Sequence, residues 1–128
     1  MLDPSLPLTL EERGEWGDPA SCDATWQAMR LYSPYDGIPA GNACASDEMQ
    51  SYPPLLVIAA EQDVRVPYTQ SLRYISRLRH RNLAHPATLF HMRRSGGHVG
   101  EGGRFRRLEQ ASIELAFLMC TLSGAADN

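Results

Sequence analysis

The sequence predicts an α/β fold in which helices flank parallel strands and the sheet is incomplete. Three features predict it: a short apolar run at 54–60, a segment of helical period at 67–81, and a second strand-like segment at 87–92. Strands that alternate with helices imply parallel strands joined by crossovers. Two strands cannot cover two long amphipathic helices, so we expect further strands to complete the sheet.

The first half of the chain predicts little regular structure. Residues 1–20 are rich in proline, glycine and acid, and predict irregular structure with a turn at Gly17-Asp18-Pro19. Residues 22–31 predict a short helix. This helix must end before Ser33-Pro34, because proline disfavours the helical conformation of the residue before it. Residues 37–51 predict a small and polar loop that cannot build a core.

The second half carries the elements of the sheet. Residues 54–60 predict a strand buried on both faces, and 67–81 predict a helix with proline in its first turn. Residues 87–92 predict the second strand, 93–103 a glycine-rich loop, and 104–122 a long helix with a buried cysteine, Cys120. Two apolar stripes are expected to pack inwards: Tyr68, Leu72, Ile75 and Leu78 on the first helix, and Phe105, Leu108, Ser112, Leu115, Met119 and Leu122 on the second.

Length and composition predict one globular domain and exclude several classes of protein. The net charge is −3, so we expect no nucleic-acid partner, because a phosphate backbone attracts basic surfaces. No apolar run approaches the roughly 20 residues of a membrane span, and the N-terminus lacks the features of a signal peptide. Cys22, Cys44 and Cys120 are an odd set without a CxxC motif, which is typical of reduced thiols in a cytoplasmic protein.

Asp63 and His98 are the candidate catalytic residues. Asp63 follows the first predicted strand, and His98 follows the second, in a loop that contains Gly96, Gly97 and Gly100. Function in open α/β sheets lies beyond the carboxyl ends of the strands, so both residues are expected at one edge. There a carboxylate can accept the imidazole Nδ1–H and leave Nε2 to take a proton from a nucleophile. An acid that only caps the next helix and a histidine in an ordinary turn are the alternatives.

The nucleophile of such a triad is not found in these residues. No Gly-x-Ser-x-Gly occurs in the chain, so the sequence predicts a part of a hydrolase rather than a whole one. A metal site made of Asp63, His91 and His98 is the competing chemistry. The chain contains no HxxxH, HExxH or paired cysteine motif, so we expect no metal and no other cofactor.

Several short motifs occur together in one order. They are Glu15-Trp-Gly-Asp-Pro19, Tyr32-Ser-Pro-Tyr-Asp36, Tyr52-Pro-Pro-Leu-Leu-Val57, Asp63-Val-Arg-Val-Pro67 and Gly97-His98. In this order they resemble the prolyl oligopeptidase family of serine hydrolases. Leu6-Pro-Leu-Thr-Leu-Glu-Glu12 and Ser95-Gly-Gly-His-Val99 are most similar to its prolyl endopeptidase-like branch, with the oligopeptidase B type as the near neighbour.

The resemblance implies that residues 1–128 are the C-terminal part of an α/β-hydrolase catalytic domain, with a β-propeller nearer the N-terminus of the complete protein. It implies that Asp63 is the triad acid, that His98 is the base, and that Arg65 binds a carbonyl oxygen of the substrate. A surface salt bridge is the alternative role for Arg65.

The resemblance also bears on activity. The nucleophilic serine of the family lies before the matching stretch, so we expect the isolated chain to be inactive. The complete enzyme would act on a short peptide or an ester. The alternatives are a (thio)esterase rather than a peptidase, and an inactive chain that serves as a protein-binding module.

Overall fold

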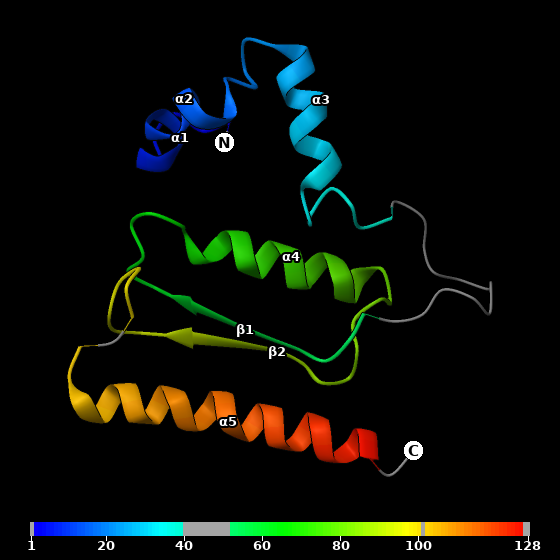
Figure 1. The fold of residues 1–128 in the computed structure, drawn as a ribbon, viewed down its shortest axis with the longest axis vertical. Helices are drawn as coiled ribbons and strands as arrows, with labels where there is room; N and C mark the ends of the chain where they lie inside the picture. The colour runs from blue at the N-terminus through cyan, green and yellow to red at the C-terminus, as the bar shows by residue number, and fades with distance from the viewer. Residues whose placement is uncertain (1, 40–51, 101, 127–128) are drawn as a thin grey trace.

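The computed structural model describes residues 2–39, 52–100 and 102–126, and in them it forms an α/β fold with an open sheet (Figure 1). The elements are, in order, α1 (Pro7–Glu11), α2 (Arg13–Trp16), α3 (Asp23–Tyr32), β1 (Leu55–Ala60), α4 (Tyr68–His80), β2 (Thr88–Arg93) and α5 (Arg104–Ala126). The predicted loop at 37–51 lies mostly outside the described residues.

The two strands are parallel, as the sequence predicted. They pair from Leu55 opposite Thr88 to Ala60 opposite Arg93, and α4 forms the crossover between them. β1 is half-buried along most of its length instead of buried on both faces. The described sheet has only two strands, so β1 has a neighbouring strand on one side and an unpaired edge on the other.

The best-packed core lies between α4 and one face of the sheet. Leu78 is 0% exposed and clusters with Ile38 and Leu83, and Leu55 of β1 packs against this cluster. Leu72, which we expected in the buried stripe, is 41% exposed. The second half of α4, which contains the buried residues Ile75 and Leu78, therefore packs more closely than its first half.

The N-terminal segment is helical, so the prediction of irregular structure was wrong. Pro7 stands in the first turn of α1, where its fixed φ suits a helix and its missing N–H is not needed. α2 ends at Gly17, whose φ of 82° a residue with a side chain rarely adopts. The helix expected at 22–31 is confirmed as α3, which stops at Ser33 in an extended conformation before proline.

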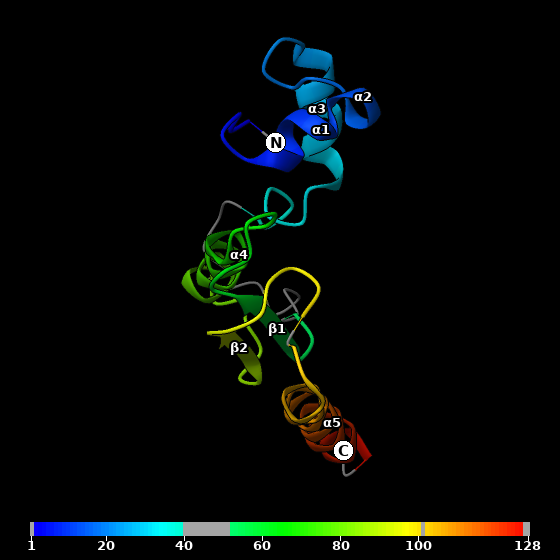
Figure 2. The same cartoon turned by 90° about the vertical axis from the view of Figure 1, so that its left-hand side faces the viewer.

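α5 lies across the sheet from α4, on the other side of the strands (Figures 1 and 2). We expected its stripe of Phe105, Leu108, Leu115, Met119 and Leu122 to be buried, and this was wrong. Phe105 is 84% exposed and Met119 is 69% exposed, and Cys120, expected in the core, is exposed as well.

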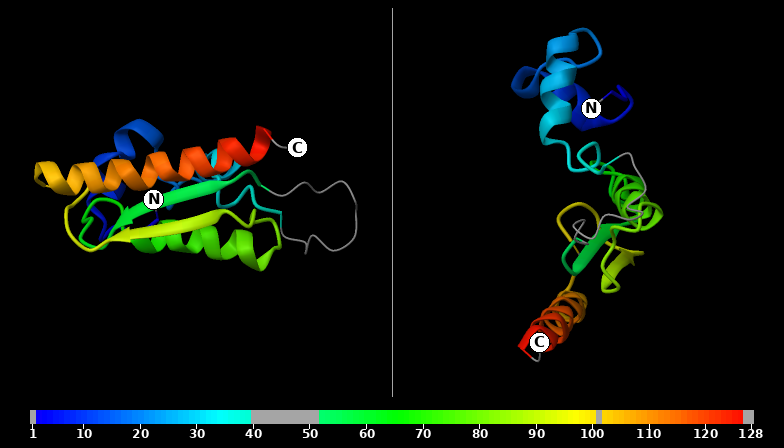
Figure 3. Two further views of the ribbon diagram at one scale, coloured as in Figure 1. Left: turned by 90° about the horizontal axis from the view of Figure 1, so that it is seen from below. Right: turned by 90° about the vertical axis from the view of Figure 1, so that its right-hand side faces the viewer.

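The half-buried side of α5 is a different one, which includes Ile113 and Phe117. The helix is apolar around most of its circumference, so its spacing could not decide which side packs. The views from below and from the side show α5 running along the strands as a separate layer (Figure 3). No helix in the described part of the chain is long and apolar enough to cross a membrane.

The core around Leu78 leads to a stability prediction. Leu78→Ala should lower the free energy of unfolding by about 2–5 kcal/mol, because it removes buried methyl groups and leaves a cavity. Leu72→Ala makes the same change of residue in the same helix, at an exposed position, and should cost less than about 1 kcal/mol. Urea denaturation of the three proteins measures the difference. Equal losses in the two variants would contradict this description of the core.

Candidate active site

The candidate site lies where the two parallel strands end. Asp63 stands three residues after β1, and His98 stands five residues after β2. The strand ends are tied together beyond the last ladder pair, because the N–H of Glu61 donates to the carbonyl oxygen of Arg93 at 2.8 Å. Both candidate residues therefore leave the sheet at the same edge, as expected for parallel strands.

The structure brings Asp63 and His98 into contact. The Nδ1 atom of His98 lies 3.1 Å from Oδ2 of Asp63, across 35 residues of sequence. The Asp63 side chain is 11% exposed and that of His98 is 44% exposed. The acid is thus sheltered, while the imidazole reaches outward to where another group could meet it.

Asp63 is held from its other oxygen by the backbone. Its Oδ1 accepts the N–H groups of Arg65 and Val66, each at 2.9 Å. An aspartate that binds backbone groups a few residues on is common in turns, so a local role was foreseeable from the sequence. Oδ1 therefore fixes the carboxylate to its own turn, and Oδ2 faces the imidazole.

The same contacts favour the ionised carboxylate. The hydrogen bond from the N–H of Val66 has the largest effect and lowers the pKa of Asp63 below its usual 3.8. Burial raises the pKa, but the hydrogen bonds with His98 and with the Arg65 backbone lower it again, so the net change is downward. An ionised carboxylate only accepts hydrogen bonds. A neutral His98 beside it therefore carries its proton on Nδ1 and presents Nε2 as a proton acceptor.

A tight loop carries His98. Gly97 and Gly100 form an isolated bridge, in which the N–H of Gly100 donates to the carbonyl oxygen of Gly97 at 3.1 Å. Gly100 has a φ of 100°, which favours glycine. The bridge encloses His98 and Val99, so the imidazole stands at the tip of the loop.

Arg65 lies beside the pair through its backbone, and its side chain is exposed. No acidic side chain in the described ranges forms an ion pair with it. Through its backbone, Arg65 stands at the same edge of the sheet as Asp63. His91, the third residue of the competing metal site, pairs with Ile58 inside the sheet. Residues 2–39, 52–100 and 102–126 contain no group of three potential metal ligands.

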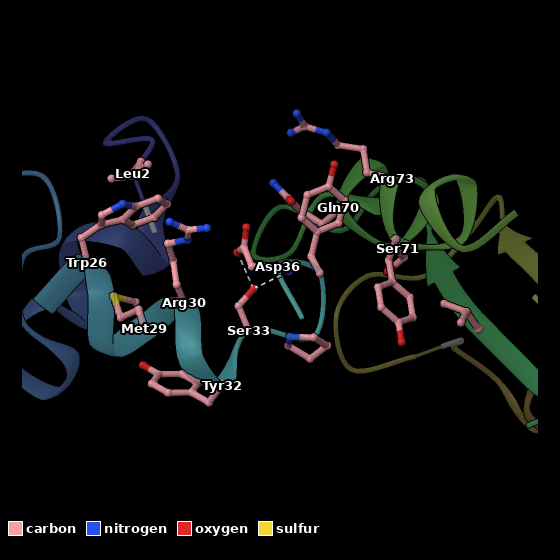
Figure 4. Close-up of a pocket in the computed structure, with 14 residues that line it drawn as sticks. Leu2, Trp26, Met29, Arg30, Tyr32, Ser33, Asp36, Gln70, Ser71 and Arg73 are labelled. Carbon is pink, nitrogen blue, oxygen red and sulfur yellow. Dashed lines mark hydrogen bonds between the residues drawn. The ribbon is translucent and has the colours of Figure 1, made fainter. Parts of the chain in front are cut away.

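A separate cavity of about 840 Å³, which was not predicted from the sequence, lies between α3, the segment that follows it and α4 (Figure 4). Trp26, Met29 and Tyr74 contribute to its lining, and Asp63 and His98 do not. Among the described residues that line it, the one carboxylate is that of Asp36, which accepts a hydrogen bond from the hydroxyl of Ser33 at 2.7 Å. The cavity is therefore distinct from the candidate active site.

Comparison with known proteins identifies the family. A model of the prolyl oligopeptidase family matches residues 1–124. The chain belongs to the prolyl oligopeptidase family. The sequence prediction of this family is therefore confirmed, and with it the assignment to the α/β-hydrolase fold.

Three members of the family illustrate the relationship. Dipeptidyl aminopeptidase BI of Pseudoxanthomonas mexicana is 32% identical over 98% of this chain, and Protease 2 of Moraxella lacunata is 32% identical over 99% of it. The structure of oligopeptidase B from Leishmania major superposes with a TM-score of 0.77 at 29% identity over 94% of the chain. The chain covers only 16%, 17% and 15% of these three proteins, respectively.

The contacts of Asp63 lead to a prediction for the pH dependence of stability. Because the pKa of Asp63 is lower in the folded chain, its ionised form stabilises the fold above the unfolded pKa, and this contribution is lost as the pH falls through the folded pKa. Asp63→Asn should therefore lose less stability than the wild type as the pH is lowered from about 5 through the range in which carboxylates take up protons. Urea denaturation across this range measures the effect, and parallel curves for the two proteins would refute it.

Proposed function

We propose that this chain is the C-terminal part of the catalytic domain of a serine-type peptidase, to which it contributes two members of a Ser-Asp-His triad. Asp63 is the acid, His98 is the base, and the nucleophilic serine lies outside the 128 residues. The observation that carries the proposal is the 3.1 Å contact between His98 Nδ1 and Asp63 Oδ2. A second observation supports it: Nε2 of His98 has no hydrogen-bond partner in the described part of the chain.

The proposed reaction follows from this geometry. Asp63 holds the imidazole with its proton on Nδ1 and stabilises the imidazolium that forms later. The Nε2 atom of His98 takes the serine proton as the serine oxygen attacks the substrate carbonyl. It then gives that proton to the leaving amine or alcohol when the scissile bond breaks. A water molecule then attacks the acyl carbon and gives a proton to Nε2. The bond from the acyl carbon to the serine oxygen breaks, and Nε2 returns the proton to that oxygen.

The substrate of the complete enzyme is proposed to be a short peptide. The names of the relatives support a peptidase, since they include a dipeptidyl aminopeptidase and a protease. Arg65 is proposed to bind a carbonyl oxygen of the substrate; its exposed side chain and its backbone hydrogen bond to Asp63 support this role. Cleavage of an ester or a thioester by the same triad is the alternative activity.

The proposed partners are the rest of the catalytic domain and a β-propeller. The support is the apolar surface that the chain leaves uncovered, which includes Leu89 of β2 and Leu115 of α5. Such surfaces are rare on proteins that act alone. The free thiols of Cys22 and Cys120 support a reducing compartment, which we propose to be the cytoplasm.

A non-catalytic binding module is the second candidate, and the same uncovered surface favours it. The two proposals differ in what the pair at Asp63 and His98 does. In a binding module, replacing either residue would leave the association with the partner unchanged and there would be no activity to lose.

The triad roles can be tested in a chimera. Protease 2 of Moraxella lacunata aligns with 99% of this chain, so the chain can replace the matching segment of that protein. In an active chimera, Asp63→Asn and His98→Ala should each lower kcat for a chromogenic peptide by about 10³- to 10⁴-fold, because the tautomer is no longer fixed or the base is lost. His80→Ala, an exposed histidine on α4, is the matched control and should keep full activity. If either triad variant stayed active, the assigned roles would be wrong.

The isolated chain gives a further prediction. Without a nucleophile it should hydrolyse no peptide or ester, and a fluorophosphonate probe should not label it, because that probe reacts with an activated serine. Mass spectrometry after incubation measures the labelling. Stoichiometric labelling of any serine in the chain would refute the proposal that the nucleophile lies elsewhere.

A further inference from the structure

Arg93 is the last residue of β2 and stands at the edge of the sheet that carries the candidate triad residues. It pairs with Ala60, the last residue of β1, and its carbonyl oxygen accepts the N–H of Glu61. The backbone of Arg93 is therefore fixed by both strands. Its side chain therefore extends from a fixed backbone position close to the loop that carries His98.

The guanidinium of Arg93 turns into that loop. Its Nη2 donates to the carbonyl oxygen of Gly97 at 3.4 Å, and its Nη1 lies 3.5 Å from the position that a Cβ on Gly100 would take. The carbonyl oxygen of Gly97 thus accepts from two donors, the Arg93 side chain and the N–H of Gly100. The guanidinium meets both residues that close the loop around His98.

The Nε and Nη1 atoms of Arg93 are buried without a hydrogen-bond partner among the residues that the structure describes. A guanidinium that stayed in water would keep all of its hydrogen bonds. The side chain of the neighbouring Arg94, by contrast, is exposed. The inward position of Arg93 is therefore supported by its contacts with Gly97 and Gly100 of the loop.

The loop offers little else that could orient His98. The His98 side chain is 44% exposed, and its hydrogen-bond partner in the described part of the chain is Asp63. Gly97, directly before His98, and Gly100, two residues after it, have no side chains that could restrict the backbone. The peptide unit between Gly97 and His98 sets the direction of the imidazole, and the oxygen of that unit is the one that Arg93 binds.

We propose that Arg93 is a positioning residue for the His98–Asp63 pair: its guanidinium holds the Gly97 carbonyl and fills the loop, so that the imidazole reaches the carboxylate. Arg93 touches neither the substrate nor the reacting atoms in this arrangement. The proposal rests on the proposed triad for its catalytic meaning, although the positioning itself can be measured without any activity. A fixed loop matters because a small misplacement of a catalytic group is costly.

The test follows the Asp63 carboxyl by NMR titration in the full 128-residue chain. The variants are His98→Ala, Arg93→Gln, Arg93→Lys and the control Arg94→Gln. His98→Ala should raise the titration midpoint of Asp63, because it removes a hydrogen bond that lowers the pKa. Arg93→Gln should raise the midpoint by at least half as much, and Arg93→Lys should restore most of the wild-type value. Arg94→Gln should leave it unchanged.

The outcomes separate the two proposals. If His98→Ala shifts the Asp63 midpoint and Arg93→Gln does not, Arg93 does not position the pair, and the proposed triad is untouched. If His98→Ala itself produces no shift, the pair does not form in solution, and the proposed function fails first. If Arg93→Gln instead removes the amide protection of β1 and β2, Arg93 supports the sheet, and its role as a positioning residue is refuted.

Discussion

The candidate site depends on how the carboxylate of Asp63 divides its two oxygens. Oδ1 accepts backbone N–H groups from its own turn, and Oδ2 faces His98. The first set of contacts is local and forms whenever the turn after β1 forms. It fixes the direction of Oδ2, so the only remaining requirement is that the end of β2 should bring an imidazole to it. The parallel pairing of β1 and β2, with Ala60 opposite Arg93, meets that requirement.

Much of this could be predicted from the sequence because it is encoded locally. Turn-forming residues separate the apolar run of β1, the helical period of α4 and the glycine-rich loop that carries His98. The strands β1 and β2 and the helix α4 appear where they were expected. The order of the elements then predicts that Asp63 and His98 leave the same edge. Their proximity follows from topology, which short-range patterns determine well when strands and helices alternate.

The faces of the helices could not be predicted in the same way. Leu72 and Met119 sit in stripes with good helical spacing, yet both are exposed, while Ile113 and Phe117 of α5 are half-buried. Spacing shows that residues share a side of a helix, and it does not show whether another element covers that side. Arg93 was missed for a related reason. An arginine at a strand end usually stays in solvent, and only the three-dimensional loop shows that it turns inward.

The Asp63–His98 pair and the uncovered apolar surfaces therefore lie in different parts of the molecule. The residues that build the acid–base pair lie between β1 and the end of the His98 loop, and the contacts that orient them are also made within this stretch. The surfaces that lack cover lie elsewhere, mainly on α5 and at the free edges of the sheet. Cover for α5 would stabilise the fold, whereas the geometry of the pair is already set by the strand ends and their loops. In the proposed function, this stretch supplies the acid and the base, and the rest of the domain supplies the nucleophile and the walls of the substrate site.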